Sequence, residues 1–261
     1  MTKMKQVQDP FLIPEYFLKI KLAGINIEVR CKNIRDFYEC GPYLSDFGEP
    51  DFTVKASEKE IADAYKQKKN VLSNAVKGVV IDELRGIESQ IVLQKITDRM
   101  IGFNTLLMHG SVVALDGRAY MFTAPSGVGK TTRTRIWIDE FPESIVVNGD
   151  KPFLRVTDSN VFACGSPWCG KEKWNTNTTV PLQAIFLLER ADDTKKNVIT
   201  RIDLASAIPV LLKQTFLSDA EDALLKTVRL LKEFEGKVNI YRLCCTPTKD
   251  AIRLAYETAG P

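Results

Sequence analysis

The run over residues 119–137, AYMFTAPSGVGKTTRTRIW, constrains the fold more than any other stretch of the chain. An apolar and aromatic segment ends at Thr123, a short loop with Gly127 and Gly129 follows, and an apolar-periodic stretch comes next. The pattern predicts a strand, a phosphate-binding loop and a helix, in that order. The plainer alternative is a glycine-rich turn with an incidental lysine.

The loop fits the pattern G-x-x-x-x-G-K-[ST], except that alanine stands first. Its glycines allow successive backbone N–H groups to point at phosphate oxygens, and the helix directs its positive N-terminal end at the same anion. Lys130 is expected to reach the β- and γ-phosphates, and the Thr131 hydroxyl to bind Mg²⁺. The predicted nucleotide-binding residues are Ser126, Gly127, Val128, Gly129, Lys130, Thr131 and Thr132.

Composition excludes several classes of function. The net charge of +3 is too small, and the basic residues too dispersed, for a nucleic-acid-binding protein. The longest apolar runs, such as residues 184–188, are too short to span a bilayer, and the N-terminus lacks the apolar region of a secretion signal. The six cysteines make no C-x-x-C pair, which favours a reducing compartment. We expect a cytoplasmic protein with no nucleic-acid or membrane partner.

Hydrophobic periodicity predicts a small α+β domain over residues 1–100 and a larger domain over residues 101–261. In the first domain we expect strands over 16–23, 25–31 and 51–55, a helix capped by Ser57, and an amphipathic helix over 87–103. In the second we expect strands over 106–115, 119–123, 143–147, 153–156, 161–164, 182–188 and 238–243, and late helices over 204–216, 219–232 and 248–256. Asp116-Gly117 predicts a tight hairpin turn. The fold class is therefore α/β, with a mixed sheet flanked by helices.

Two further residues are candidates for the chemistry. Asp150 ends a predicted strand after the loop, where it can serve as a metal ligand or accept a proton from a substrate hydroxyl. Its plainer reading is a turn aspartate, since Asn-Gly-Asp is turn chemistry. His109, the only histidine, lies in the strand expected beside the loop strand. It is either a hydrogen-bond partner or proton relay near the phosphates, or a structural residue.

Residues 165–177 form a long polar loop that holds two of the three tryptophans. Aromatic side chains beside Lys, Glu and Asn are typical of a binding surface, although a packed Ω-loop is the alternative. Lys171 or Lys173 is expected to meet phosphate oxygens, and Glu172 a metal. The predicted substrate-binding residues are Trp168, Lys171, Trp174 and Asn175.

The order His109-Gly110, then A-P-S-G-V-G-K-T, then V-V-N-G-D resembles the catalytic domain of HPr kinase/phosphorylase. That family in turn resembles ATP-dependent phosphoenolpyruvate carboxykinase in its nucleotide-binding core. Residues 165–177 match the G-x-P-W-C-G-K-E-x-W-N-T-N run of HPr-kinase-related bacterial proteins, some of which phosphorylate a serine in lasso-peptide precursors. The resemblance covers residues 105–180 well and the rest of the chain loosely.

The resemblance implies ATP- and Mg²⁺-dependent phosphorylation of a hydroxyl. It maps the family's base onto Asp150, its histidine onto His109 and its loop glutamate onto Glu172. The family's paired aspartates fall on Gly149 and Asp150, so only the second is kept. The expected catalytic residues are Asp150, His109 and Lys130, and the expected metal ligands are Thr131, Asp150 and Glu172. Because members of the family often assemble, a homo-oligomer is compatible with the resemblance.

Three functions follow as hypotheses. The first is a kinase that phosphorylates a serine of a peptide or protein, and its variant is a kinase of a polyol or other small metabolite. The second is a non-catalytic regulator that binds ATP, which the single remaining aspartate keeps open. The third, a carboxykinase-like lyase, is disfavoured because the chain is short.

Overall fold

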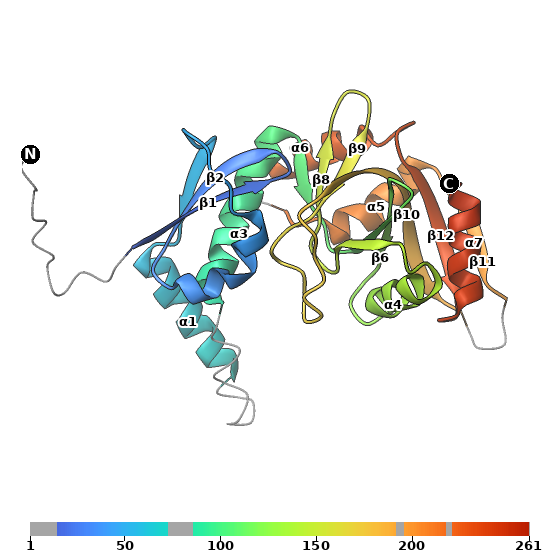
Figure 1. Ribbon diagram of the computed structural model, residues 1–261, viewed down its shortest axis with the longest axis horizontal. Helices are drawn as coiled ribbons and strands as arrows, with labels where there is room; N and C mark the ends of the chain where they lie inside the picture. The colour runs from blue at the N-terminus through green and yellow to red at the C-terminus, as the bar shows by residue number, and fades with distance from the viewer. Residues whose placement is uncertain (1–14, 73–85, 192–195, 218–220, 261) are drawn as a thin grey trace, which may run out of the picture.

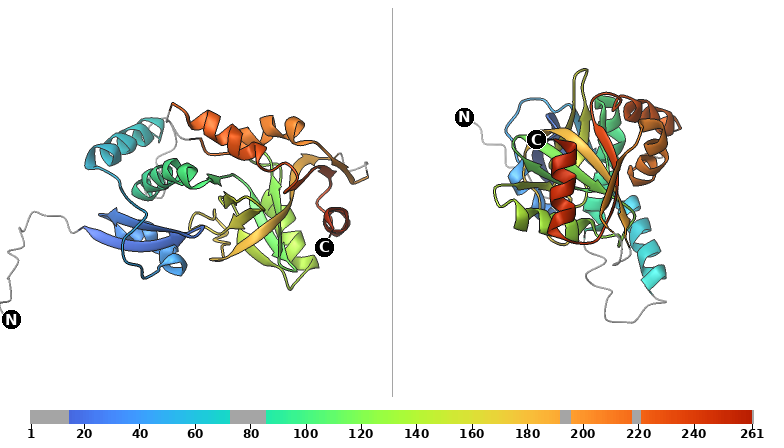
Figure 2. Two further views of the ribbon diagram at one scale, coloured as in Figure 1. Left: turned by 90° about the horizontal axis from the view of Figure 1, so that it is seen from above. Right: turned by 90° about the vertical axis from the view of Figure 1, so that its right-hand side faces the viewer.

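The computed structural model describes residues 15–72, 86–191, 196–217 and 221–260. Within these residues the chain forms a mixed α/β fold in two parts that lie side by side (Figures 1 and 2). The N-terminal part carries a three-stranded sheet in the order β1-β2-β3. Its elements are β1 (Tyr16–Leu22), β2 (Ile25–Cys31), the 3₁₀ helix η1 (Ile34–Tyr43), β3 (Phe52–Lys55), α1 (Glu58–Leu72) and α3 (Ile87–Met100).

Local sequence accounts for the N-terminal elements. β1 and β2, which correspond to two predicted strands, form an antiparallel hairpin, and its two turn residues, Ala23 and Gly24, have φ angles of 49° and 83°. Positive φ at both positions is the geometry of a tight turn that matches the twist of the strands. Ser57 caps α1 as predicted, because the Glu60 amide donates to its Oγ at 3.3 Å. The Ser57 amide donates in return to Glu60 Oε2 at 2.7 Å, which completes a capping box.

The larger part is built on a nine-stranded sheet in the order β4-β8-β9-β10-β6-β5-β7, with β12 beside β10 and β11 beside β12. β6, β10 and β12 run parallel, whereas their outer neighbours pair antiparallel, so the predicted mixed sheet is confirmed. The long β10 pairs first with β9 and then with β6 and β12, which curls the sheet. The elements are η2 (Ile101–Phe103), β4 (Thr105–Leu107), β5 (Ser111–Leu115), β6 (Arg118–Thr123), α4 (Lys130–Glu140), β7 (Ile145–Asn148), β8 (Phe153–Val156), β9 (Val161–Cys164), β10 (Thr179–Arg190), β11 (Val198–Arg201), α5 (Leu204–Gln214), α6 (Ala223–Lys232), β12 (Asn239–Cys245) and α7 (Lys249–Ala259).

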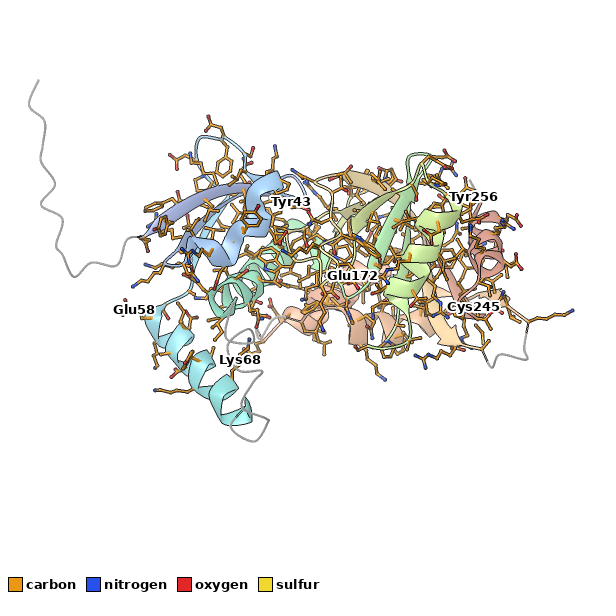
Figure 3. All side chains as sticks on the ribbon, turned by 60° about the horizontal axis from the view of Figure 1, so that its bottom comes forward. Tyr43, Glu58, Lys68, Glu172, Cys245 and Tyr256 are labelled. Atoms are coloured by element: carbon orange, nitrogen blue, oxygen red, sulfur yellow. The ribbon has the colours of Figure 1, made fainter. Side chains whose placement is uncertain are left out.

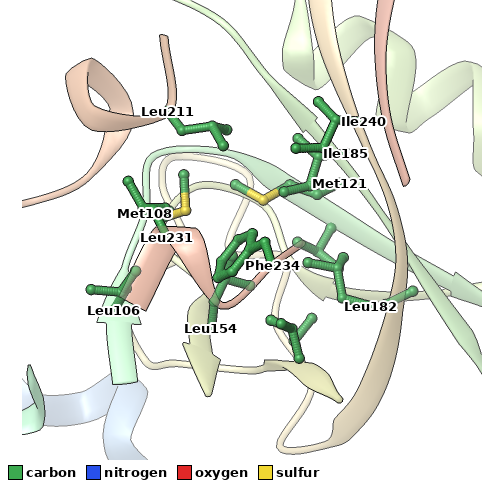
Figure 4. Close-up of a cluster of buried hydrophobic side chains, with 14 of the residues drawn as sticks. Leu106, Met108, Met121, Leu154, Leu182, Ile185, Leu211, Leu231, Phe234 and Ile240 are labelled. Atoms are coloured by element: carbon green, nitrogen blue, oxygen red, sulfur yellow. The ribbon is translucent and has the colours of Figure 1, made fainter. Parts of the chain in front are cut away.

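Helices cover both faces of this sheet. On one face, α5 and α6 pack on a core that contains Met121, Ile185 and Leu211 (Figure 4). On the other face, α4 and α7 enclose a second core around Trp137 and Phe186. β6 therefore lies at the centre of the sheet, between β5 and β10, and is buried on both sides. This burial fixes the end of β6 from which the glycine-rich loop leaves.

The structure differs from the sequence expectations in two respects. The strand predicted over 106–115 is divided into β4 and β5, because residues 108 and 110 donate their amides to Pro152 and Asp150 instead of continuing one ladder. The helix η1 and the short edge strand β11 have no counterpart in the prediction. The expected start of a helix at residue 219 lies outside the described residues, within which α6 begins at Ala223.

The two parts of the molecule share one hydrophobic cluster. Leu107, Phe153 and Cys164 of the larger part are buried together with the core of β1, β2 and α3. The guanidinium of Arg155 in β8 also donates to the Ala23 carbonyl at 2.6 Å, so the β1–β2 turn is held on the larger sheet. Within the described ranges, none of the helices has the length and hydropathy needed to cross a bilayer.

Candidate functional site

The predicted strand–loop–helix unit is present. β6 ends at Thr123 and α4 begins at Lys130, and the loop between them contains Gly127 and Gly129 with φ angles of 81° and 109°. Gly129 is the N-cap of α4 and offers no side chain to its first turn. The first amides of a helix have no intrahelical acceptor, so those of α4 remain available to an anion.

Two arginines hold the loop through its carbonyl groups. Arg133 donates to the Val128 carbonyl at 3.0 Å and to the Cys245 carbonyl of β12 at 2.8 Å. Arg190 of β10 donates to the Gly127 carbonyl at 2.6 Å. Gly129 has a left-handed φ angle of 109°, and a Cβ atom there would lie 2.1 Å from the Arg133 guanidinium, so another residue would strain the backbone and displace this anchor. The loop is therefore anchored by its carbonyl groups, and sequence reasoning missed both anchors because their acceptors are backbone atoms.

Lys130 is buried, with 8% of its surface exposed. Its Nζ donates to the carbonyls of Ala124 and Pro125 at 2.8 and 3.4 Å. Burial lowers the pKa of Lys130, and the negative charge of Asp150 opposes that shift. The lysine is thus a desolvated cation within the field of the Asp150 carboxylate.

Asp150 and His109 are in direct contact, with His109 Nε2 at 3.3 Å from Asp150 Oδ1. Lys151 Nζ lies 3.3 Å from the other carboxylate oxygen, Oδ2. Burial alone would raise the pKa of Asp150, but the His109 hydrogen bond and the Lys151 charge outweigh burial and lower it. The carboxylate is therefore ionised at neutral pH, as a proton acceptor or metal ligand must be.

His109 is held from three sides. Its amide donates to the Gln214 carbonyl at 2.6 Å, and its carbonyl accepts from the Thr123 hydroxyl at 2.7 Å. Its Nδ1 lies 3.2 Å from Gln214 Oε1, so the ring is fixed between Gln214 and Asp150. Gln214 is buried at the end of α5 and is 105 positions away in the sequence, which is why no local pattern signals it.

Asn148 orients the Asp150 turn. Its Oδ1 accepts the amides of Asp150 and Lys151 at 2.8 and 2.7 Å, and its Nδ2 donates to the Ser166 carbonyl at 2.9 Å. Ser166 in turn donates its hydroxyl to the Lys151 carbonyl at 2.6 Å. The Asn-Gly-Asp sequence signalled a turn, and the structure shows that this turn aims the candidate carboxylate.

Two glycines let residues 165–177 approach Asp150. A Cβ atom at Gly149 would lie 3.1 Å from the Cys169 carbonyl and 3.3 Å from the Trp174 Cβ. Glycine at this position, where the resemblance expects a second aspartate, is thus explained by close packing of the loop. Gly170 has a φ angle of 80°, and a Cβ there would lie 3.1 Å from the Asp150 Cβ.

These elements meet around a cavity of about 490 Å³. Figure 3 shows Glu172, one of its lining residues, near the middle of the molecule between the N-terminal part and α4. Val128 is the one predicted loop residue that does not line it. The lining residues are His109, Ser126, Gly127, Gly129, Lys130, Thr131, Thr132, Gly149, Asp150, Gly170, Lys171 and Glu172.

Three predicted substrate residues lie outside this cavity. Trp168 is half-buried against the N-terminal core, and its Nε1 donates to the Ser89 hydroxyl at 3.0 Å. Asn175 accepts from the Tyr43 hydroxyl at 3.0 Å, and the Trp174 ring lies 5.6 Å from the Arg135 guanidinium. Trp168 and Asn175 thus join the loop to the N-terminal part, and Trp174 lies on α4.

The oxygen atoms around the larger cavity are too few to hold a metal ion alone, but they suit one that a bound nucleotide also coordinates. In the part of the chain that the structure describes, no three His, Cys, Asp or Glu side chains are grouped to hold a metal ion. Thr131, Asp150 and Glu172 do line the same cavity. Mg²⁺ is commonly held by one or two carboxylates, with phosphate oxygens and water as its other ligands, so these oxygens fit a nucleotide-bound Mg²⁺.

Comparison with solved structures gives a weak likeness. No family model matches the chain, and no curated protein matches its sequence. Among solved structures, the chain is similar to the HPr(Ser) kinase/phosphatase from Coxiella burnetii, with a TM-score of 0.34 and 11% identity. The likeness covers 57% of this chain and 84% of that one. At this TM-score it does not assign the chain to a family.

Proposed function

We propose that the protein is an ATP- and Mg²⁺-dependent phosphotransferase that transfers the γ-phosphoryl group to a hydroxyl. One observation carries the proposal: the amide-rich loop with Lys130 and the His109–Asp150 pair line the same cavity. Phosphoryl transfer needs charge stabilisation around a triphosphate and a residue that takes the proton of the attacking hydroxyl. Residue types that can meet both requirements line this one cavity.

Each residue has a distinct task in this proposal. The loop amides and Lys130 bind the phosphates, and Thr131 and Glu172 supply oxygen ligands for Mg²⁺, which balances the charge of the triphosphate. Asp150 accepts the proton of the acceptor hydroxyl while His109 holds the carboxylate in position. Asn148 holds the backbone amide of Asp150, and Gln214 contacts the His109 ring.

The test is transfer of label from γ-labelled ATP in the presence of Mg²⁺ and a heat-treated cell extract. We expect a labelled product with the wild type and none with Lys130→Ala, whose loop lacks the cation that meets the phosphates. Lys232→Ala serves as the control, because Lys232 is an exposed residue at the end of α6.

The size of the labelled product distinguishes a peptide or protein serine from a small metabolite. Tight ATP binding without Lys130-dependent transfer to either would contradict the proposal. That result would support the ATP-binding regulator, for which Asp150 without a second aspartate at position 149 is the relevant observation.

A further inference from the structure

A second, open cavity of about 290 Å³ lies beside the His109–Asp150 pair. It shares these two residues with the larger cavity, so the two cavities meet at the pair. The second cavity is otherwise bordered by the residue after Asp150 and by the end of α5 and the residues that follow it. The lining side chains used below are His109, Asp150, Lys151, Lys213, Gln214 and Phe216.

Positive charge exceeds negative charge in this cavity. Lys151 and Lys213 both line it, and Asp150 is the only carboxylate among its lining residues. Lys151 is already engaged with Asp150 and lies 5.8 Å from the centre of the Phe216 ring. Lys213 is exposed, and no carboxylate of the described residues forms an ion pair with it. Among these residues, the Lys213 ammonium group is therefore available to a ligand that enters the cavity.

The wall that carries these groups is fixed by backbone pairing. The His109 amide donates to the Gln214 carbonyl, and the Phe216 amide donates to the Leu107 carbonyl at 2.9 Å. Met108 and Thr215 form a β-bridge between these two hydrogen bonds. The cavity is therefore held at a constant position relative to Asp150, which is a requirement for binding a reactant beside a base.

We infer that this cavity is the acceptor site, and that the acceptor is a small alcohol with a carboxylate or phosphate group; the inference rests on the function proposed above. The anionic group binds Lys213 and Lys151, and the hydroxyl lies against Asp150. The hydroxyl oxygen forms a bond to the γ-phosphorus and its proton passes to Asp150. The bond between the γ-phosphorus and the β–γ bridging oxygen breaks, and ADP leaves.

The size of this cavity suits a small acceptor. It corresponds to about ten water molecules at liquid density, enough for a compound of a few carbons. A peptide acceptor would need an open groove beside Trp168, and a separate open hollow of about 280 Å³ lies there, with Lys151 and Gly170 also in its lining. The serine acceptor implied by the sequence resemblance is therefore the competing outcome of the test.

The test measures ADP release in the presence of Mg²⁺ and ATP with three probes of similar skeleton: glycerol, glycerate and glycerol 3-phosphate. We expect turnover with at least one anionic probe and a KM about tenfold or more lower than for glycerol, because a charge-assisted contact is lost with the neutral alcohol. Lys213→Gln should raise the KM for the anionic probe by a similar factor and leave the KM for ATP unchanged. Lys232→Gln, an exposed lysine on α6, is the matched control.

Two results would overturn the inference while leaving the proposed function intact. One is Lys130-dependent transfer to a peptide or protein with none to these probes. The other is equal use of neutral and anionic alcohols, with no effect of Lys213→Gln. If the wild type neither binds ATP nor releases ADP with any acceptor, the proposed function itself has failed, and the inference fails with it.

Discussion

Two features of the surroundings of Asp150 shift its pKa in opposite directions. Burial favours the neutral acid, whereas the contacts with His109 and Lys151 favour the carboxylate. The contacts prevail, and the pKa is lowered. The candidate base is therefore ready to accept a proton at neutral pH, but its readiness depends on two neighbouring side chains.

Replacement of Lys151 by methionine tests this dependence. Without the ammonium group the carboxylate loses a stabilising charge, so the pKa of Asp150 rises. The measurement is kcat/KM against pH for the wild type and Lys151→Met, and we expect the acid limb of this profile to move to higher pH in the variant. Lys151→Arg keeps the charge and should leave the limb close to its original position. An acid limb that stays in place in Lys151→Met would show that this charge does not control the base.

Sequence motifs predicted residues that line the larger cavity, but not the residues that hold them in place. Lys130 and Asp150 follow local motifs, and a strand–loop–helix pattern carries its own signal. Arg133 and Gln214 act through backbone carbonyls and side chains more than a hundred positions away. No local pattern encodes such partners, because they are brought together only by the folding of the sheet.

At the scale of elements, the loop over residues 165–177 makes two kinds of contact. Gly170, Lys171 and Glu172 in its middle line the larger cavity, whereas Trp168 and Asn175, on either side of them, contact the N-terminal part. The sequence predicted one binding surface, since aromatic and polar residues are mixed along the whole loop. Composition does not reveal which side of a loop faces a cavity and which faces a neighbouring element.

Gly170→Ala tests how closely this loop controls Asp150. The new Cβ would meet the Asp150 Cβ at 3.1 Å, and the left-handed backbone adds a cost of about 1 kcal/mol. Gly236→Ala is the matched control, because Gly236 also has a positive φ but nothing lies within 4 Å of its Cβ position. We expect similar losses of unfolding free energy in urea, with a lower kcat in Gly170→Ala alone. Equal kcat values in the two variants would show that the packing of Gly170 against Asp150 does not affect phosphoryl transfer.

Strands and helices with a strong apolar period were predictable, including the hairpin at Asp116-Gly117, where both residues have positive φ. The short exposed β11 was not, because its strand conformation comes from pairing with β12. The division of the strand predicted over 106–115 also depends on distant partners. Elements that owe their form to tertiary contacts thus account for the differences.

At the scale of the whole molecule, one hydrophobic cluster crosses the expected domain boundary. Phe153 of β8 is fully buried among side chains of the N-terminal sheet and α3. A core that is shared in this way couples the folding of both parts, because neither can expose the cluster without cost.

The shared core predicts that the two parts unfold together. Phe153→Ala should lower the free energy of unfolding by about 3 to 5 kcal/mol and do so in both parts. Hydrogen exchange measured by mass spectrometry checks this, with β1–β2 reporting the N-terminal part and β6 the larger part. If β1–β2 opened at a lower free energy than β6, and Phe153→Ala left that value unchanged, the two parts would be independent domains.

The most direct measurement of the central claim compares ATP binding and γ-phosphoryl transfer in Lys130→Ala and Asp150→Asn, with Asp158→Asn, in an exposed turn, as the control. We expect Lys130→Ala to weaken ATP binding by about tenfold or more. We expect Asp150→Asn to bind ATP still, but to transfer the phosphoryl group at no more than about one hundredth of the wild-type rate. Unchanged ATP binding by Lys130→Ala, or full transfer by Asp150→Asn, would contradict the proposed phosphotransferase mechanism.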